Sequence, residues 1–163
     1  MSHKNQHEDC YPKFDPKPWD EKVHEWQDKL FIKNSLPQFF HMPLPGMFRR
    51  TINRLWKLAQ DAQAAADMKD FLLLAHDPTP WKSDLYMLVT HEVPGADNVR
   101  LSGTFISKVF DGPFSKVPQY IWEMDVYLSK QEKLARKYYF YYTTCPKCAR
   151  KYGHNYIVAF AEV

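Results

Sequence analysis

Two cysteines near the C-terminal end have the spacing that is most specific for chemistry in this sequence. Cys145 and Cys148 form a CPKC motif, and His154 follows in the same segment. Two thiolates at this spacing are typical of a zinc knuckle, because the turn directs both sulfurs to one ion. His154 would then be a third ligand, and Cys10 in the N-terminal arm a fourth. A redox pair and two reduced surface thiols are the other interpretations. All three stay open, and zinc is the one cofactor that the motif suggests.

Two carboxylates are the candidates for acid–base catalysis. Glu123 follows Trp122 in an expected helix, and a carboxylate beside an aromatic ring in a closed pocket can act as an acid or a base. Glu92 ends an expected strand beside His91, and strand alternation allows only one of these two neighbours to face a ligand. The alternative for both glutamates is a solvated surface position, which is common for this residue type.

Aromatic residues are the candidates for ligand binding. Residues 138–142 read YYFYY, so Tyr139 and Tyr141 share one face of a strand and the other three residues share the opposite face. One set packs on helices; the other set either faces a ligand or simply consists of good strand formers. The residues that we expect to contact a ligand are Phe39, His41, Trp81, Tyr86, Phe105, Tyr120, Tyr139 and Tyr141.

The composition excludes several classes of protein. Of the 163 residues, 45% are hydrophobic and 16% aromatic, which is enough to bury a core and to line an aromatic pocket. The net charge of +3 comes from scattered basic residues without a nucleic-acid-binding motif. Three cysteines do not suit a secreted disulfide framework, no apolar run reaches membrane-spanning length, and the N-terminus has no signal-peptide core. We therefore expect a cytoplasmic protein with no nucleic-acid or membrane partner.

A strand–turn–helix unit that occurs twice would position these residues. Residues 101–110 alternate like a strand, Asp111-Gly112-Pro113 forms a turn, and a helix follows over residues 117–135. Four identities lie 66 residues apart: Phe39 and Phe105, Gly46 and Gly112, Phe48 and Phe114, Trp56 and Trp122. Chance in an aromatic-rich chain is the alternative, but an internal duplication explains the matches better. It predicts that the two tryptophans are equivalent core residues.

Similar patterns predict the remaining elements. The ranges are a short helix over 19–30, an extended segment over 31–42, a helix over 48–66, strands over 71–76, 85–93, 138–144 and 156–163, and a loop over 145–155. The fold class is therefore α+β: two pseudo-symmetric β-α-β-β modules form one antiparallel sheet with both helices on one face. The modules are residues 31–95 and 99–163; residues 1–30 are an N-terminal arm with the short helix, and all three parts make one compact domain.

The duplicated plan, the FDGPF turn at residues 110–114 and the closing IVAFAEV strand at 157–163 resemble the GyrI-like small-molecule-binding family. That resemblance implies a cleft between the modules, lined with aromatic residues and often holding a buried glutamate; some family members are hydrolases. The sequence departs from the family at the strand KYYFYYTT, residues 137–144, which has no carboxylate. It also has no DNA-binding domain, so we do not expect a transcription factor.

The expected function follows mainly from this resemblance. We expect the chain to bind a hydrophobic or aromatic small molecule between its modules and to act as a hydrolase of that molecule, with Glu123 or Glu92 activating water. A non-catalytic sequestering protein is one alternative. A zinc-stabilised interaction module organised by the CPKC loop is the other.

Overall fold

The computed structural model describes residues 14–67, 69–143 and 146–163. Cys10 and Cys145 therefore lie outside the described residues. The strands are β1 Lys22–Phe39, β2 Met42–Pro43, β3 Leu73–Thr79, β4 Lys82–Leu88, β5 Asp97–Asp111, β6 Lys137–Tyr142 and β7 Tyr156–Glu162. The helices are α1 Met47–Asp61, α2 Val117–Ser129 and α3 Pro146–Tyr152, and a short 3-10 turn covers Phe114–Lys116.

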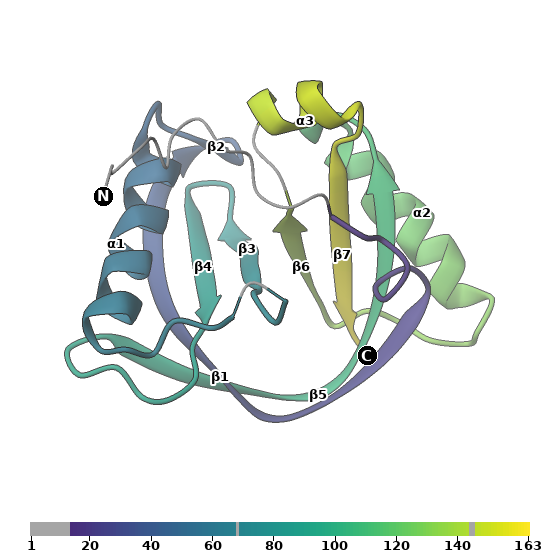
Figure 1. Cartoon of the computed structure of the whole chain (residues 1–163). Coiled ribbons are helices and arrows are strands. Elements are labelled where there is room, and N and C mark those ends of the chain that lie inside the picture. The colour runs from purple at the N-terminus through teal and green to yellow at the C-terminus, as the bar shows by residue number, and fades with distance from the viewer. Residues whose placement is uncertain (1–13, 68, 144–145) are drawn as a thin grey trace.

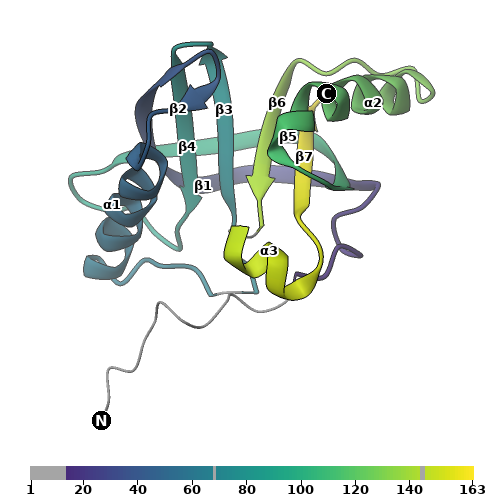
Figure 2. The ribbon, with the colours of Figure 1, turned by 90° about the horizontal axis from the view of Figure 1, so that it is seen from above.

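The sheet closes on itself, and this corrects the predicted fold class. Its strand order is β2-β1-β4-β3-β6-β7-β5, and β5 pairs back with β1, so six antiparallel strands form a closed barrel with β2 as an extra strand. The predicted flat sheet with both helices on one face is wrong. Figure 1 shows α1 and α2 on opposite outer sides, and Figure 2 shows β3 and β6 between them. The ring has an inner face and an outer face, and only the outer face carries these two helices.

Closure depends on the length of β1, which the sequence analysis underestimated. The helix predicted over residues 19–30 is wrong, because residues 22–30 are the first half of β1 and pair with β5, and residues 19–21 form a turn. The helix-like spacing of Val23, Trp26 and Leu30 arises from a bulge between Trp26 and Lys29, where the register against β5 shifts. The bulge reverses strand alternation, so Trp26 and Phe31 both face inward although they are five residues apart.

Each large helix covers the outer face of one half of the ring. In α1 the buried residues are Thr51, Leu55 and Ala59; in α2 they are Tyr120, Met124 and Leu128. A spacing of four places each set on one side of its helix. Leu55, Ala59, Met124 and Leu128 pack there on aliphatic strand residues, whereas Tyr120 packs on Phe110 and Phe140. In the parts of the chain that the structure describes, no helix is long and apolar enough to cross a membrane.

The two halves share their element order, but their helices are not in the register that the duplication predicted. In the sheet, neighbouring strands follow one another as β1-β4-β3 in one half and as β5-β7-β6 in the other. Along the chain, a large helix follows the first strand of each half. The buried stripes of α1 and α2 correspond at an offset of 69 residues (51 and 120, 55 and 124, 59 and 128), not 66. Trp122 is consequently 65% exposed, so its predicted core role is wrong, whereas Trp56 packs against Phe71. The division into modules 31–95 and 99–163 stays a prediction.

The turn before α2 needs glycine for a reason that the sequence analysis did not give. Gly112 does not have a positive φ; a Cβ at this position would collide with the hydroxyl of Tyr120. That hydroxyl donates a hydrogen bond to the carbonyl oxygen of Pro113 at 3.1 Å. The ring of Tyr120 also stacks on Phe110 at 4.8 Å, so the FDGPF turn is fixed to the start of α2 by packing.

Candidate functional site

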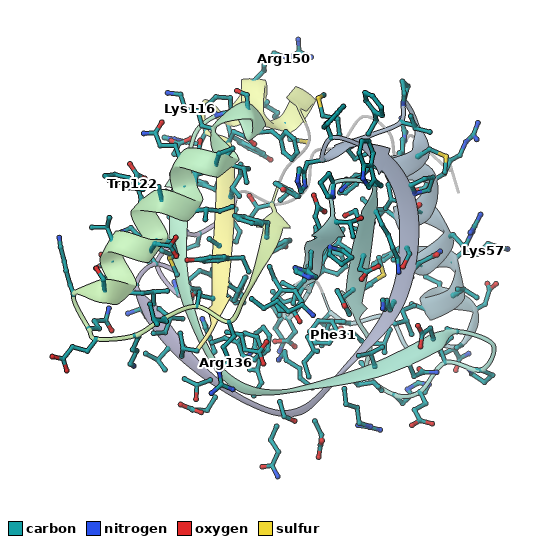
Figure 3. All side chains as sticks on the ribbon, turned by 180° about the vertical axis from the view of Figure 1, so that it is seen from behind. Phe31, Lys57, Lys116, Trp122, Arg136 and Arg150 are labelled. Carbon is teal, nitrogen blue, oxygen red and sulfur yellow. The ribbon has the colours of Figure 1, made fainter. Side chains whose placement is uncertain are left out.

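The inner face of the ring holds a buried aromatic cluster. We call this set the inner cluster: Phe31, Leu72, Leu74, Tyr86, Phe105, Tyr139, Val158 and Phe160. Its members come from six strands, with Leu72 directly before β3, and all are at most 4% exposed. The ring of Tyr139 contacts those of Tyr86 and Phe105, with 5.6 Å and 6.1 Å between ring centroids. Figure 3 shows Phe31 within the curve of the sheet, whereas Trp122 and Lys57 lie on the outer sides of the helices.

The segment before β1 covers part of this cluster. The ring of Trp19 packs edge-on against that of Phe160, with 5.9 Å between ring centroids. The ring of Phe14 packs edge-on against that of Tyr141, with 6.1 Å between centroids. Figure 1 shows this purple segment passing in front of β7. Its position is fixed by a buried hydroxyl, because Ser107 donates a hydrogen bond to the carbonyl oxygen of Trp19 at 2.6 Å. Residues 14–21 are therefore part of the inner face.

A buried carboxylate lies at one end of the inner face. Asp84 is 5% exposed and shares a strand face with Tyr86, two residues away. Ser35 donates a hydrogen bond to its Oδ1 at 2.5 Å, and the Nζ atoms of Lys33 and Lys82 are 3.6 and 3.7 Å from its carboxylate oxygens. Two cations and a hydroxyl stabilise the negative charge of this carboxylate in a largely desolvated position.

His76 lies opposite Asp84 in the register of β3 and β4, and its environment fixes its chemistry. The carbonyl oxygen of Tyr138 is 2.9 Å from Nδ1 and can only accept, so Nδ1 carries the proton. Nε2 is then left with a free lone pair. Burial lowers the pKa of this imidazole below its usual value of 6.5, although the bond to Tyr138 acts in the opposite direction. The ring is 5.5 Å from that of Tyr139. His76 is therefore a neutral base at the edge of the inner cluster.

Two phenols of the inner cluster are held in their neutral form. Burial raises the pKa of Tyr86 to about 12, and burial together with the negative charges of Glu162 and Asp84 raises the pKa of Tyr139 to about 12. A lysine ammonium group also lies over each ring. The Nζ of Lys33 is 5.9 Å from the ring centroid of Tyr86, and the Nζ of Lys137 is 5.1 Å from the ring centroid of Tyr139. The phenols can thus donate hydrogen bonds, and their ring faces accept cations.

The structure brings four of the eight expected ligand-contacting residues to this face and places the others elsewhere. Tyr86, Phe105 and Tyr139 belong to the inner cluster, and Tyr141 packs against it. Tyr120 lies in the outer core under α2. The remaining three are at the tips of two turns, where the Phe39 and Trp81 rings are 5.5 Å apart and His41 pairs with Asp77 at 2.9 Å. Tyr139 and Tyr141 therefore share one face of β6, as strand alternation predicted, and this is the inner face.

Neither glutamate that was expected to be catalytic approaches the inner cluster. The Glu123 carboxylate accepts a hydrogen bond from Gln119 at 3.5 Å on the outer helix α2. The side chain of Glu92 is 68% exposed and pairs with Arg100 at 3.4 Å. Both contacts are typical of solvated surface carboxylates. The catalytic assignment of these two residues stays a prediction that this placement does not favour.

The CPKC segment contains a helix where a loop was predicted. Cys148 lies in α3 and is 3% exposed, and Cys145 is outside the described residues. The Nδ1 of His154 is 2.7 Å from the Asp111 carboxylate. Among the described residues, no group of three or more potential metal ligands comes together. The zinc site stays a prediction.

Sequence analysis missed Asp84 and His76. Both were visible as polar residues within apolar strands, and Asp84 stands two residues before Tyr86, on the face already assigned to that tyrosine. The cross-strand pairing that joins them could not be read from the sequence. A separate open hollow of about 770 Å³ lies beside the segment between α2 and β6 and is lined by Glu25, Thr104, residues 133–136 and Val163. It contains none of the expected site residues.

A family model described as bacterial hydrolase matches residues 1–163. The chain belongs to the bacterial hydrolase family. A search of curated proteins gave no match. The family description agrees with the expected hydrolase class, but it names neither a substrate nor a catalytic residue.

Several solved structures share the fold of this bacterial hydrolase family member. The C-terminal domain of EcmrR is 10% identical with a TM-score of 0.64, and covers 88% of this chain and 96% of its own. A hydrolase from Listeria innocua is 11% identical with a TM-score of 0.59, covering 88% and 92%. SAV2435, solved bound to tetraphenylphosphonium, is 12% identical with a TM-score of 0.51, covering 88% and 93%. At these identities the comparison shows the fold alone, and that fold fits the GyrI-like resemblance.

Proposed function

We propose that this protein binds an apolar or aromatic small molecule on the inner face of the ring and hydrolyses it. The observation that carries the proposal is the neutral base His76, in register with Asp84 and in ring contact with Tyr139. The bacterial hydrolase description supports the reaction class. The neighbour bound to tetraphenylphosphonium supports a hydrophobic ligand for this fold.

Binding would rest on the aromatic rings. A flat or apolar ligand gains by stacking against Tyr86, Tyr139 and Phe105, and the phenol hydroxyls supply hydrogen bonds. The arm residues Phe14 and Trp19 would have to shift for a ligand to reach the cluster, and on return they would exclude water from it. Ligand selection therefore depends on the arm as well as on the strands.

Hydrolysis would use His76 as the general base. Its Nε2 accepts a proton from a water molecule while the water oxygen forms a bond to an electrophilic carbon of the substrate. The bond from that carbon to its leaving heteroatom breaks. Tyr86 or Tyr139 donates a hydrogen bond to the leaving atom, which takes up the proton that His76 received. Asp84 would favour the imidazolium through its negative charge, which acts on His76 from the facing strand.

The test is to separate turnover from binding with a substitution at His76. Binding of tetraphenylphosphonium is followed by quenching of tryptophan fluorescence, and turnover is measured on a panel of aromatic esters and aromatic epoxides. We expect His76→Gln to lower hydrolysis about 100-fold or more, as loss of a general base does, and to retain binding. Glu123→Gln is the matched control and should change neither. Wild-type turnover by the His76→Gln variant, or loss of turnover in Glu123→Gln, would reject this assignment.

A sequestering protein without turnover is the second candidate, favoured by the lysine–tyrosine contacts. The ring faces of Tyr86 and Tyr139 already receive the ammonium groups of Lys33 and Lys137. A hydrophobic cation could take the place of these ammonium groups beside the carboxylate of Asp84. Tight binding of tetraphenylphosphonium with no hydrolysis across the panel would select this function.

A further inference from the structure

Five large apolar side chains are exposed together at one end of the ring. We call them the tip patch: Phe39, Phe40, Met42, Leu44 and Trp81, which are 60, 62, 64, 47 and 50% exposed. They come from the β1–β2 turn with the segment after it and from the β3–β4 turn. Backbone hydrogen bonds of 2.9 Å join the two turns, from Gln38 N to Trp81 O and from His41 N to Pro80 O. The Phe40 ring is 4.6 Å from Phe39 and 4.8 Å from Trp81.

The backbone at the tip is unfavourable for the residues it carries. Phe39 pairs with Met42, so Phe40 and His41 form a two-residue hairpin turn. Both have positive φ, 47° and 64°. Turns of this type normally use Asn-Gly, because a bulky side chain at positive φ is strained. A phenylalanine here is both strained and exposed, so neither local conformation nor burial explains it. Strain of this kind is characteristic of functional positions.

Unpaired arginines adjoin the tip patch. The chain runs from Leu44 directly into the first turn of α1, which carries Arg49 and Arg50 and no acidic residue. Basic side chains at a helix N-terminus oppose the helix dipole, so helix stability does not account for them. Arg54 follows one turn later. None of these three forms an ion pair with another described residue, whereas Lys57 pairs with Asp61. The tip patch therefore lies beside positive charge that no described carboxylate neutralises by an ion pair.

We propose that the tip patch is a membrane-docking site that inserts into the surface of an anionic lipid bilayer. Phe, Trp, Met and Leu side chains at the ends of protruding turns can enter the interfacial region of a bilayer, while adjacent arginines contact lipid phosphates. Figure 2 shows the β3–β4 turn and β2 at the same end of the structure. We expected no membrane partner from the sequence because no apolar run is long enough to span a bilayer. Docking of two turns requires no such segment.

The direct test is co-sedimentation of the full chain with vesicles. We expect binding to equimolar phosphatidylglycerol and phosphatidylcholine, much weaker binding to pure phosphatidylcholine, and loss of binding at high salt because the arginine contribution is screened. Arg49→Ser with Arg50→Ser should weaken binding about 30-fold, since each basic side chain contributes about fivefold at an anionic surface. Equal binding to both kinds of vesicle, or none to either, would overturn the proposal.

A second variant separates docking from folding. Asparagine tolerates positive φ, so Phe40→Asn should leave the melting temperature unchanged or raise it, and yet reduce vesicle binding tenfold or more. Trp122→Ser is the matched control, because it removes an aromatic side chain that is 65% exposed on the outer side of α2. It should not change vesicle binding. Self-association in analytical ultracentrifugation that Phe40→Asn abolishes, without any vesicle binding, would instead make the tip patch a contact between two copies.

Discussion

The outer face of the ring under α1 buries mainly aliphatic side chains, whereas the inner face buries aromatic rings beside polar groups. Under α1 the buried core contains Leu55, Ala59 and Leu85. Under α2 it is mixed, because Met124 and Leu128 are joined there by the aromatic residues Phe110, Tyr120 and Phe140. The inner cluster contains five aromatic residues, and buried Asp84 and half-buried His76 adjoin it. Aliphatic packing stabilises a fold without offering chemistry. Burying polar groups among aromatic rings costs desolvation energy, and such buried polar groups are characteristic of functional sites.

The largest expected loss of stability comes from a substitution in the outer-face core, and it tests whether the two faces have separate roles. Leu55 is 1% exposed in the core under α1. We expect Leu55→Ala to lower the free energy of unfolding by about 3 kcal/mol, because it leaves a cavity in a packed core. Urea denaturation measures this loss. The affinity of the folded protein for tetraphenylphosphonium should not change; a matching loss of affinity would show that the two faces are not independent. Leu134→Ala, at a side chain 84% exposed, is the control.

A substitution on the inner face should lower stability less than Leu55→Ala does, but should weaken ligand binding more. Asp84→Asn keeps the shape of the side chain but removes the charge that faces Lys33 and Lys82. We expect the unfolding free energy to fall by about 1–2 kcal/mol and the affinity for tetraphenylphosphonium to fall about tenfold. Glu92→Gln removes an exposed charge as a control. Unchanged affinity in Asp84→Asn, measured by fluorescence titration, would remove this carboxylate from the ligand site.

The inner face should also make stability depend on pH. Burial lowers the pKa of both His24 and His76 below 6.5. The unfolded chain then binds more protons than the folded chain, so the unfolding free energy should decrease as pH falls from about 6.5 toward the folded pKa values. Denaturant midpoints between about pH 5 and 7 measure this slope. The double variant His24→Gln, His76→Gln should flatten it, and an unchanged slope in that variant would assign the dependence to other groups.

The smallest effect is expected at Trp122, one of the two tryptophans that the sequence offset paired. Trp56 packs on Phe71, and Trp122 is 65% exposed. We expect Trp56→Ala to cost about 2 kcal/mol and Trp122→Ala less than about 0.5 kcal/mol of unfolding free energy, because exposed truncations leave no cavity. Thermal denaturation under identical conditions gives both values. Equal losses would favour the core equivalence that the 66-residue offset predicted.

Much of the secondary structure could be predicted, because it depends on local patterns. The alternation over residues 101–110 and 138–142 gave β5 and β6, and the spacing of apolar residues gave α1 and α2. Alternation also separated Tyr139 from Phe140 onto the two faces of β6. The prediction failed at residues 19–30, where the bulge at Trp26 imitates a helical period. A bulge depends on the partner strand, and that partner is some 70 residues away in sequence.

By itself, the sequence determined the order of the six main strands and the two large helices, the aromatic surplus and the faces of β6, because neighbouring residues fix these through backbone geometry. Only the tertiary structure decided that β1 pairs with β5 and closes the ring, since this pairing needs contacts between distant segments. Closure in turn placed the helices on opposite sides, set His76 beside Tyr139, and moved Glu92 and Glu123 away from the inner face. The tip patch has the same origin, because two turns far apart in sequence meet there through backbone hydrogen bonds.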